Sequence, residues 1–277
     1  MSSDLKKRIL FGALFLAVMI CALFFRYGAF CLMMVIMCGA IDEFIDLSLG
    51  KDSIKLQRHL CQIAGLLLLT LSTLHCQGDL DIRWTALALL PVIAIPLSFI
   101  FSGKTDQTDK LMPVYTSLAY IALPIALSPY LLYTDGVYSG KLMLSLFILI
   151  WVSDSGAYCF GTAFGQKPDS RKLAPSISPK KSWWGFWGSI FAGVAAGAVL
   201  YFTSMLQFPL VHCLVLGAII PPVCVCGDLV ESMWKRRYSV KDSGNLIPGH
   251  GGYLDRFDSS LAAIPVAAIY LMIFGLI

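Results

Sequence analysis

Charged residues are scarce in this sequence. Asp, Glu, Lys and Arg make up only 14% of its 277 residues, whereas hydrophobic residues make up 57%. A soluble globular protein carries about 25% charged and about 45–50% apolar residues. The shortage of charge therefore excludes a soluble fold. Because the apolar residues are spread over many segments, we expect an all-α, polytopic membrane protein.

Histidine and cysteine patterns typical of metal sites are also missing. The chain has only four His, and its nine Cys include no Cys-x-x-Cys pair. Most of the cysteines lie within apolar runs, so we interpret them as small hydrophobic residues. The net charge of +4 is not typical of a nucleic-acid-binding protein and is better explained by loops that face anionic lipid head groups.

A cleavage site is missing after the first apolar run. Lys6, Lys7 and Arg8 precede this run, as in a signal peptide, but no small-x-small site followed by a polar region comes after it. We therefore expect the first helix to be retained.

Nine segments approach the roughly 20 apolar residues that a membrane span needs. Only Arg26 separates the first two, so they form a tight hairpin or include a re-entrant segment. The candidate spans are Ile9–Phe25, Tyr27–Ile41, His59–Cys76, Trp84–Phe101, Leu111–Tyr133, Leu142–Phe160, Trp183–Met205, Leu210–Trp234 and Ser259–Ile277.

The basic residues predict how these spans are oriented. With a cytoplasmic N-terminus and alternating loops, all of the 21 Lys and Arg residues except Arg26, Arg83 and Lys141 fall on the cytoplasmic side. This bias supports nine spans, with the C-terminus outside. From the short N-terminus and the compact length we expect a bacterial inner membrane.

Unusual polar residues are concentrated in the second half of the chain. Residues 1–140 are apolar spans joined by ordinary loops, and we expect them to form a scaffold. Residues 141–277 contain two long basic loops, predicted to be cytoplasmic, and we expect them to form the catalytic region.

Acidic residues within spans are costly and usually functional. The alternation of spans brings five of them to the cytoplasmic side at similar depth, which predicts a cation site. Carboxylates suit a hard cation such as Mg²⁺, and with one nearby His a zinc site lacks ligands. The five residues are Asp154, Asp228, Glu231, Asp255 and Asp258.

Two other features of the spans have simpler interpretations. Asp42, Glu43 and Asp46 at the end of the second span are interpreted as a solvated interfacial face. Pro221 and Pro222 either break the eighth span where it lines a cavity or only kink it.

The loop Lys241–Gly252 is rich in glycine and flanked by cations. Gly249, Gly251 and Gly252 permit positive φ and close backbone approach to a ligand, and backbone amides in such a turn bind phosphate. Nearby cations are available to neutralise a polyanion: Lys235, Arg236, Lys241 and Arg256 on this side, and Lys180 and Lys181 before the seventh span. Ser232 and Lys235 share a helical face with Asp228.

These residues form a long motif that resembles the signature of the phosphatidate cytidylyltransferases, or CDP-diglyceride synthases. The motif is Ser232-x₂-Lys235-Arg236-x₄-Lys241-Asp242-x-Gly244-x₂-Ile247-Pro248-x-His250-Gly251-Gly252-x₂-Asp255-Arg256-x-Asp258. Segments Trp151–Gly165 and Ser178–Ser189 resemble the same family, so the likeness covers most of residues 150–260. Trp184 departs from it, because a polar residue is expected there.

The resemblance implies an all-helical, dimeric, Mg²⁺-dependent membrane enzyme. Members condense CTP with phosphatidic acid, releasing pyrophosphate and making CDP-diacylglycerol. The family's metal-binding acids match Asp228 and Asp258, with Asp255 close by.

Under this hypothesis the three aspartates hold one or more cations, and the phosphate of phosphatidic acid attacks the α-phosphorus of CTP. Asp228, Lys241, Asp255 and Asp258 are the predicted catalytic residues. The predicted substrate-binding residues are Asp154, Lys180, Lys181, Ser232, Lys235, Arg236, Gly249, His250, Gly251, Gly252 and Arg256.

Two rival functions remain open. A CTP-dependent polyprenol or dolichol kinase would release CDP instead of pyrophosphate, but the complete motif argues against it. An ion-coupled transporter would need a path across the membrane, yet the acids cluster on one side and no inverted repeat is visible.

Overall fold

The computed structural model describes residues 3–51, 54–101, 103, 105–167, 169–244 and 251–277. The chain folds into two compact, almost entirely helical units. The first contains Met1–Gly140 and Val240–Arg256, and the second contains Lys141–Ser239 and Phe257–Ile277. The segment 240–256 thus belongs with the N-terminal unit, although it lies far along the chain.

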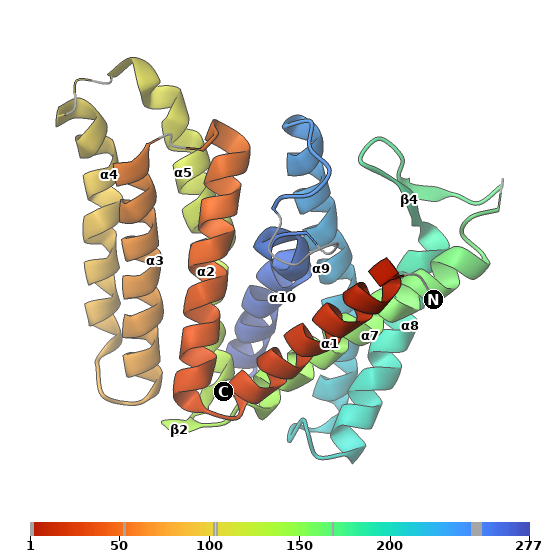
Figure 1. Ribbon diagram of the computed structural model, residues 1–277. Helices are drawn as coiled ribbons and strands as arrows, with labels where there is room; N and C mark the ends of the chain where they lie inside the picture. The colour runs from red at the N-terminus through yellow and green to blue at the C-terminus, as the bar shows by residue number, and fades with distance from the viewer. Residues whose placement is uncertain (1–2, 52–53, 102, 104, 168, 245–250) are drawn as a thin grey trace. The chain divides into compact units, whose positions relative to one another are not determined.

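The first unit is a set of long helices joined by short turns (Figure 1). Its helix α3 packs against α2 and α4, and two short strands precede the second unit. In chain order the elements are α1 (Ser3–Leu23), α2 (Arg26–Leu49), α3 (Lys55–Cys76), η1 (Ile82–Ala88), α4 (Leu89–Phe101), η2 (Thr105–Lys110), α5 (Leu111–Ser117), η3 (Leu118–Ala122), α6 (Leu123–Ala126), η4 (Ser128–Leu131), β1 (Tyr133–Thr134) and β2 (Val137–Tyr138).

The second unit is built on three helices that pack in chain order, α7 on α8 and α8 on α9. A two-stranded hairpin joins α7 to α8. The elements are α7 (Lys141–Ala163), β3 (Lys172–Ala174), β4 (Ser178–Ser182), α8 (Trp183–Phe202), α9 (Leu210–Arg237) and α10 (Tyr253–Ile273). Helix α10 starts in the first unit and continues in the second.

The expectation of an all-α polytopic membrane protein is confirmed. Among the described residues, eight helical segments are long and apolar enough to cross a membrane. They correspond to the second through ninth expected spans. The first expected span is α1, whose described apolar part, Gly12–Leu23, is shorter.

Two local expectations are now decided. Helices α1 and α2 are separate and joined at Phe24 and Phe25, so the first two spans are helices that meet at a tight turn. Helix α9 runs without a break through Pro221 and Pro222, and the broken-helix interpretation is therefore wrong.

Small residues bring the helices of the second unit close together. A Cβ atom at Gly193 in α8 would clash with the carbonyl oxygen of Gly217 in α9, and one at Gly217 would clash with the carbonyl oxygen of Gly193. Close backbone approach through small residues is the usual way in which helices associate in membranes. This contact holds α9, which carries the acidic residues discussed below, against α8.

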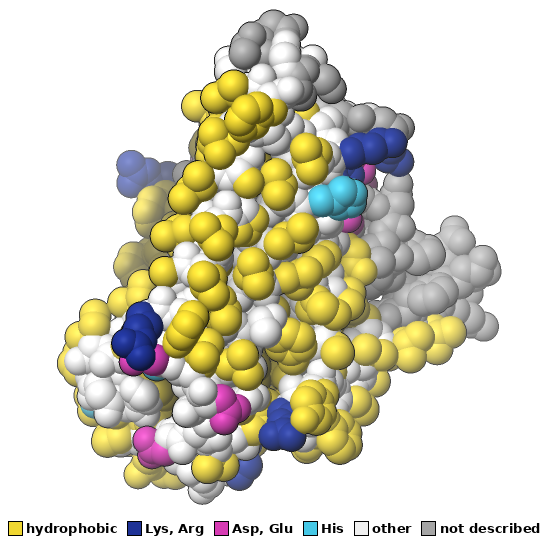
Figure 2. Space-filling view, turned by 90° about the vertical axis from the view of Figure 1, so that its left-hand side faces the viewer, with side chains coloured by type: hydrophobic (Ala, Val, Ile, Leu, Met, Phe, Trp, Pro, Cys, Tyr) yellow, Lys and Arg dark blue, Asp and Glu magenta, His cyan; other side chains and the backbone are white. Residues whose placement is uncertain are grey.

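The outer surface suits a lipid environment. Figure 2 shows a face that is mostly covered by hydrophobic side chains. On α4, Leu90 is 63% exposed and Ile93 is 57% exposed. Such residues are stable at the surface when they face lipid rather than water.

Candidate active site

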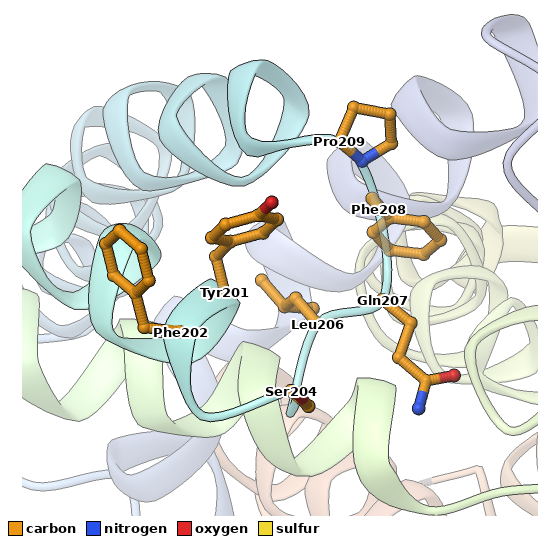
Figure 3. Close-up of a pocket in the computed structure, with 7 residues that line it drawn as sticks. All are labelled: Tyr201, Phe202, Ser204, Leu206, Gln207, Phe208 and Pro209. Carbon is orange, nitrogen blue, oxygen red and sulfur yellow. The ribbon is translucent and has the colours of Figure 1, made fainter.

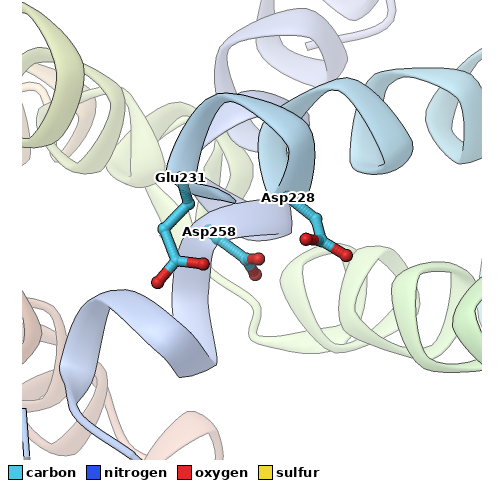
Figure 4. A group of neighbouring side chains, drawn as sticks. All are labelled: Asp228, Glu231 and Asp258. Atoms are coloured by element: carbon cyan, nitrogen blue, oxygen red, sulfur yellow. The ribbon is translucent and has the colours of Figure 1, made fainter. Parts of the chain in front are cut away.

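Three carboxylates meet in the second unit where α9 and α10 come together (Figure 4). Asp228 and Glu231 lie on α9 and Asp258 lies on α10, and one oxygen from each lies within 4.8 Å of the others. The side chain of Glu231 is only 4% exposed, whereas that of Asp228 is 42% exposed. The cluster therefore extends from a buried position to an accessible one.

A glycine makes this meeting of the two helices feasible. A Cβ atom at Gly227 would lie 2.6 Å from the carbonyl oxygen of Asp258, so only glycine fits without a shift. The Ser259 hydroxyl also donates a hydrogen bond to the Cys224 carbonyl, at 3.4 Å. The backbone of α10 thus touches α9 just before Asp228.

Two lysines lie against the acids. The Lys181 ammonium is 2.7 Å from Asp228 Oδ2 and donates to the Val225 carbonyl at 3.3 Å. The Lys235 ammonium is 2.6 Å from Glu231 Oε2. Each of these two carboxylates thus has an ammonium group beside it.

Two further predicted residues belong to this cluster. The Ser232 hydroxyl donates to Asp228 Oδ1 at 3.2 Å. Asp154, on α7, is close enough to interact electrostatically with Asp228 and Lys181. The structure therefore brings together residues from α7, β4, α9 and α10.

The donor set fits a hard divalent cation. Carboxylate oxygens are the ligands that Mg²⁺ prefers, at about 2.0–2.1 Å, so ligands of one ion lie within about 4.2 Å of each other. The observed spread of at most 4.8 Å needs only small side-chain rotations to reach that geometry. Glu231, one of the five acids expected at a cation site, is the third member of this group.

Asp255 instead binds the two described ends of the glycine-rich loop, within the first unit. Its Oδ2 accepts hydrogen bonds from the Ser243 amide at 2.8 Å, the Ser243 hydroxyl at 2.8 Å and the Gly252 amide at 2.9 Å. Gly251 has φ +82°, and a side chain there would collide with the Asp255 carboxylate. These contacts give Asp255 a structural task, and its predicted role as a metal ligand stays a prediction.

Glu43 on α2 has a role that the sequence did not predict. Its Oε1 accepts a hydrogen bond from the Tyr253 amide at 2.8 Å, and its Oε2 accepts one from the Leu254 amide at 3.0 Å. The Ser243 hydroxyl lies 3.2 Å from Oε2. The interpretation of this acid as part of a solvated face is wrong, because its carboxylate caps α10.

The two neighbouring acids on α2 also have partners. Asp42 and Asp46 both form ion pairs with Arg58 on α3, and Asp42 accepts a hydrogen bond from Gln62. They tie α2 to α3 instead of facing only solvent.

Of the remaining predicted residues, Lys180 and Arg236 belong to the second unit, whereas Lys241, Gly251, Gly252 and Arg256 belong to the first. Arg236 donates from Nε to the Ile177 carbonyl at 3.4 Å. Gly249 and His250 lie outside the described residues. Among the predicted substrate-binding and catalytic residues, the cations Lys180, Arg236, Lys241 and Arg256 are exposed.

A cavity of about 530 Å³ lies at the other end of α9 (Figure 3). It is lined by residues between Tyr201 and Pro209 in the α8–α9 connection. Asp228 follows the start of α9 by 18 residues, or about 27 Å along the helix axis. The cavity is therefore remote from the acidic cluster.

Helices long enough to cross a membrane thus carry a cluster of carboxylates and ammonium groups. This combination suits a membrane enzyme that acts on phosphates. The comparison of sequences makes the assignment specific. The chain belongs to the cytidylyltransferase family, which matches residues 6–274.

The similar proteins include three phosphatidate cytidylyltransferases. That of Haemophilus influenzae is 42% identical over 191 residues, which cover 66% of this chain and 64% of the relative. That of Pseudomonas aeruginosa is 35% identical over 224 residues, covering 78% and 73%. That of Bacillus subtilis is 42% identical over 128 residues, covering 46% of each. The match therefore spans slightly less than two thirds of the first relative and about half of the third.

Proposed function

We propose that this chain transfers the cytidylyl group of CTP to phosphatidic acid, giving CDP-diacylglycerol and pyrophosphate. The family match over residues 6–274 carries the proposal, and the relatives with this activity support it. The acidic cluster adds chemical support, because the reaction must bring two polyanions together.

In this reaction a phosphate oxygen of phosphatidic acid attacks the α-phosphorus of CTP. The bond between the α-phosphorus and the oxygen that bridges it to the β-phosphate breaks, and pyrophosphate leaves. The second pKa of a phosphate monoester is about 6, so the nucleophile is already anionic near neutral pH. A dedicated general base is unnecessary. The work left for the protein is positioning and charge neutralisation.

Asp228, Glu231 and Asp258 would hold Mg²⁺, which when bound supplies positive charge to the phosphates. Lys181 and Lys235 pair with Asp228 and Glu231 and so offset part of the repulsion among the carboxylates. When the polyanionic substrate binds, the same ammonium groups would turn toward its phosphate oxygens. Ser232 and Asp154 line this side of the site.

The predicted contacts from the glycine-rich loop are part of the proposal. Lys241, Arg256 and the Gly251 and Gly252 backbone would bind phosphates, with Gly249 and His250 completing the loop. Lys180 and Arg236 are exposed cations that suit the same task. The side chain of Asp255 would hold this loop in shape through its bonds to Ser243 and Gly252.

We also propose an inner-membrane location with the N-terminus and the active site in the cytoplasm, the C-terminus outside, and a homodimeric assembly. The distribution of basic residues supports the orientation. Cysteine-accessibility labelling from either side tests the orientation, and light scattering in detergent tests the dimer.

The decisive experiment is pyrophosphate release by the purified protein in mixed micelles that contain CTP, phosphatidic acid and Mg²⁺. Release that requires all three, is abolished by EDTA and accompanies a CDP-lipid product is the expected result. Release of CDP instead would replace the proposal with a lipid kinase. Absence of both products from folded protein would refute it.

A further inference from the structure

We infer that Glu43 is a positioning residue for the active site, because it fixes the start of the helix that carries Asp258. The inference rests on the proposed cytidylyltransfer for its kinetic consequence. Its structural basis lies wholly within the first unit, which contains α2, Ser243 and the first turn of α10.

The first turn of α10 needs an external hydrogen-bond acceptor. The first amides of any α-helix have no acceptor within the helix, and a polar side chain just before the helix usually supplies one. Here the preceding residue is Gly252, which has no side chain. Glu43 supplies both acceptors from α2, one oxygen to Tyr253 and the other to Leu254. Its negative charge also suits the positive end of the helix dipole.

Glycines at three positions make room for this cap. A Cβ atom at Gly244 or at Gly252 would clash with the Glu43 carboxylate. A Cβ atom at Gly39, one turn before Glu43 on α2, would clash with the Tyr253 ring. Gly252 was expected to permit close approach to a ligand, but in the structure the close approach is made to Glu43.

The cap has a consequence further along α10. Asp258 follows Leu254 by four residues, so it lies about one helical turn beyond the capped amides. The axial position and rotation of this first turn set the direction in which Asp258 leaves the helix. The described hydrogen bonds of Glu43 go to Ser243 and to the first two amides of α10, so its effect on Asp258 is transmitted along the helix.

The test combines hydrogen exchange with steady-state kinetics. Glu43→Gln keeps the size of the side chain but puts an NH₂ group against one of the two amides. Exchange at the Tyr253 and Leu254 amides should become at least about tenfold faster, because one hydrogen bond is lost and the other no longer has a charged acceptor. The kcat should fall by about tenfold or more, with the KM for phosphatidic acid within about twofold, since Glu43 does not contact substrate.

Two further variants sharpen the result. Glu43→Asp keeps the charge but is too short to reach both amides, so its kcat should lie between those of wild type and Glu43→Gln. Gly244→Ala keeps every hydrogen-bonding group and displaces the carboxylate, so it should speed exchange at the same two amides even where Glu43→Gln fails to fold. The matched control is Asp46→Asn. Asp46 lies about one turn after Glu43 on α2 and pairs with Arg58, so the change removes a nearby negative charge without touching the cap. It should leave exchange at these amides unchanged.

Unchanged exchange at Tyr253 and Leu254 in Glu43→Gln or in Gly244→Ala would overturn the inference. Faster exchange with unchanged kcat would overturn it as well. Absence of pyrophosphate release from the wild type would count against the proposed function, whereas the exchange data would still decide whether Glu43 is the cap.

Discussion

Asp258→Asn is expected to abolish turnover and yet stabilise the protein in the absence of divalent cations. The change is nearly isosteric. The remaining oxygen of the amide can still accept the hydrogen bond from the Ser259 amide, which is 2.6 Å long in the wild type. What the change removes is one of three negative charges whose oxygens lie within 4.8 Å of each other.

The size of the effect follows from Coulomb's law. Two unit charges 4.8 Å apart repel by about 3.5 kcal/mol at an effective dielectric constant of 20. Asp258 has two such neighbours, Asp228 and Glu231. The lysines beside those neighbours and partial exposure offset most of this repulsion, so we expect a net gain of about 1–2 kcal/mol. Function and stability are thus expected to change in opposite directions, as is common at active sites.

The assay is thermal denaturation of detergent-solubilised protein, in EDTA and with increasing Mg²⁺, beside pyrophosphate release. Asp258→Asn should denature a few degrees above the wild type in EDTA and should gain little from Mg²⁺, whereas the wild type should gain with concentration. Asp255→Asn is the matched control on the same helix. It weakens the hydrogen bonds from Ser243 and Gly252 and should therefore lower the denaturation temperature.

A lower denaturation temperature of Asp258→Asn in EDTA would refute the argument from repulsion. A normal response to Mg²⁺ together with normal turnover would remove Asp258 from the metal site.

Three other perturbations have definite expected outcomes. Lys235→Met removes the ammonium that pairs with the Glu231 carboxylate, which is 4% exposed, and should cost about 3 kcal/mol in thermal or denaturant stability. An unchanged stability would contradict a stabilising role of the pair. Gly217→Val pushes a side chain into the backbone of α8 and should cost about 3 kcal/mol, visible as a loss of monodisperse protein, whereas the same change at an exposed α9 position should be tolerated. Tyr138→Phe removes the hydrogen bond, 2.7 Å long, to the carbonyl at the end of α1 and should cost about 1 kcal/mol. Burial, together with the nearby Tyr133, raises the pKa of Tyr138 to about 12 from 10.0. The stabilisation by the Tyr138 hydroxyl is therefore complete below pH 10 and is lost as the pH rises through 12. If the stability of the wild type declines no more than that of the Phe variant over that range, the Tyr138 hydroxyl does not stabilise the fold.

The spans could be predicted because a run of about 20 apolar residues has one physical solution in a bilayer. Alternation of the spans also brought Asp228, Glu231 and Asp258 to the same side, and the structure groups these three. The strand alternation of β4 directs Lys181 to Asp228, whereas Lys180 is exposed.

What failed were inferences from local rules. The Pro221–Pro222 pair suggested a break, but Pro221 is buried where α9 packs against Gly193 of α8, and the helix continues. Glu43 carries no local sign of its role, because its partners at Tyr253 and Leu254 are 210 and 211 residues away. Only tertiary structure shows that an acid at the end of an early span completes the N-terminus of the last helix.

The separation of Glu43 from Tyr253 along the chain also affects the order of events during biosynthesis. At about 5–20 residues per second, a ribosome needs roughly 10–40 seconds to make the stretch between Glu43 and Tyr253. During that interval the α2 carboxylate has been delivered to the membrane without the amides that it will bind, and an acid there is costly. The N-terminal half of this protein therefore finishes folding only after translation has reached its last helix.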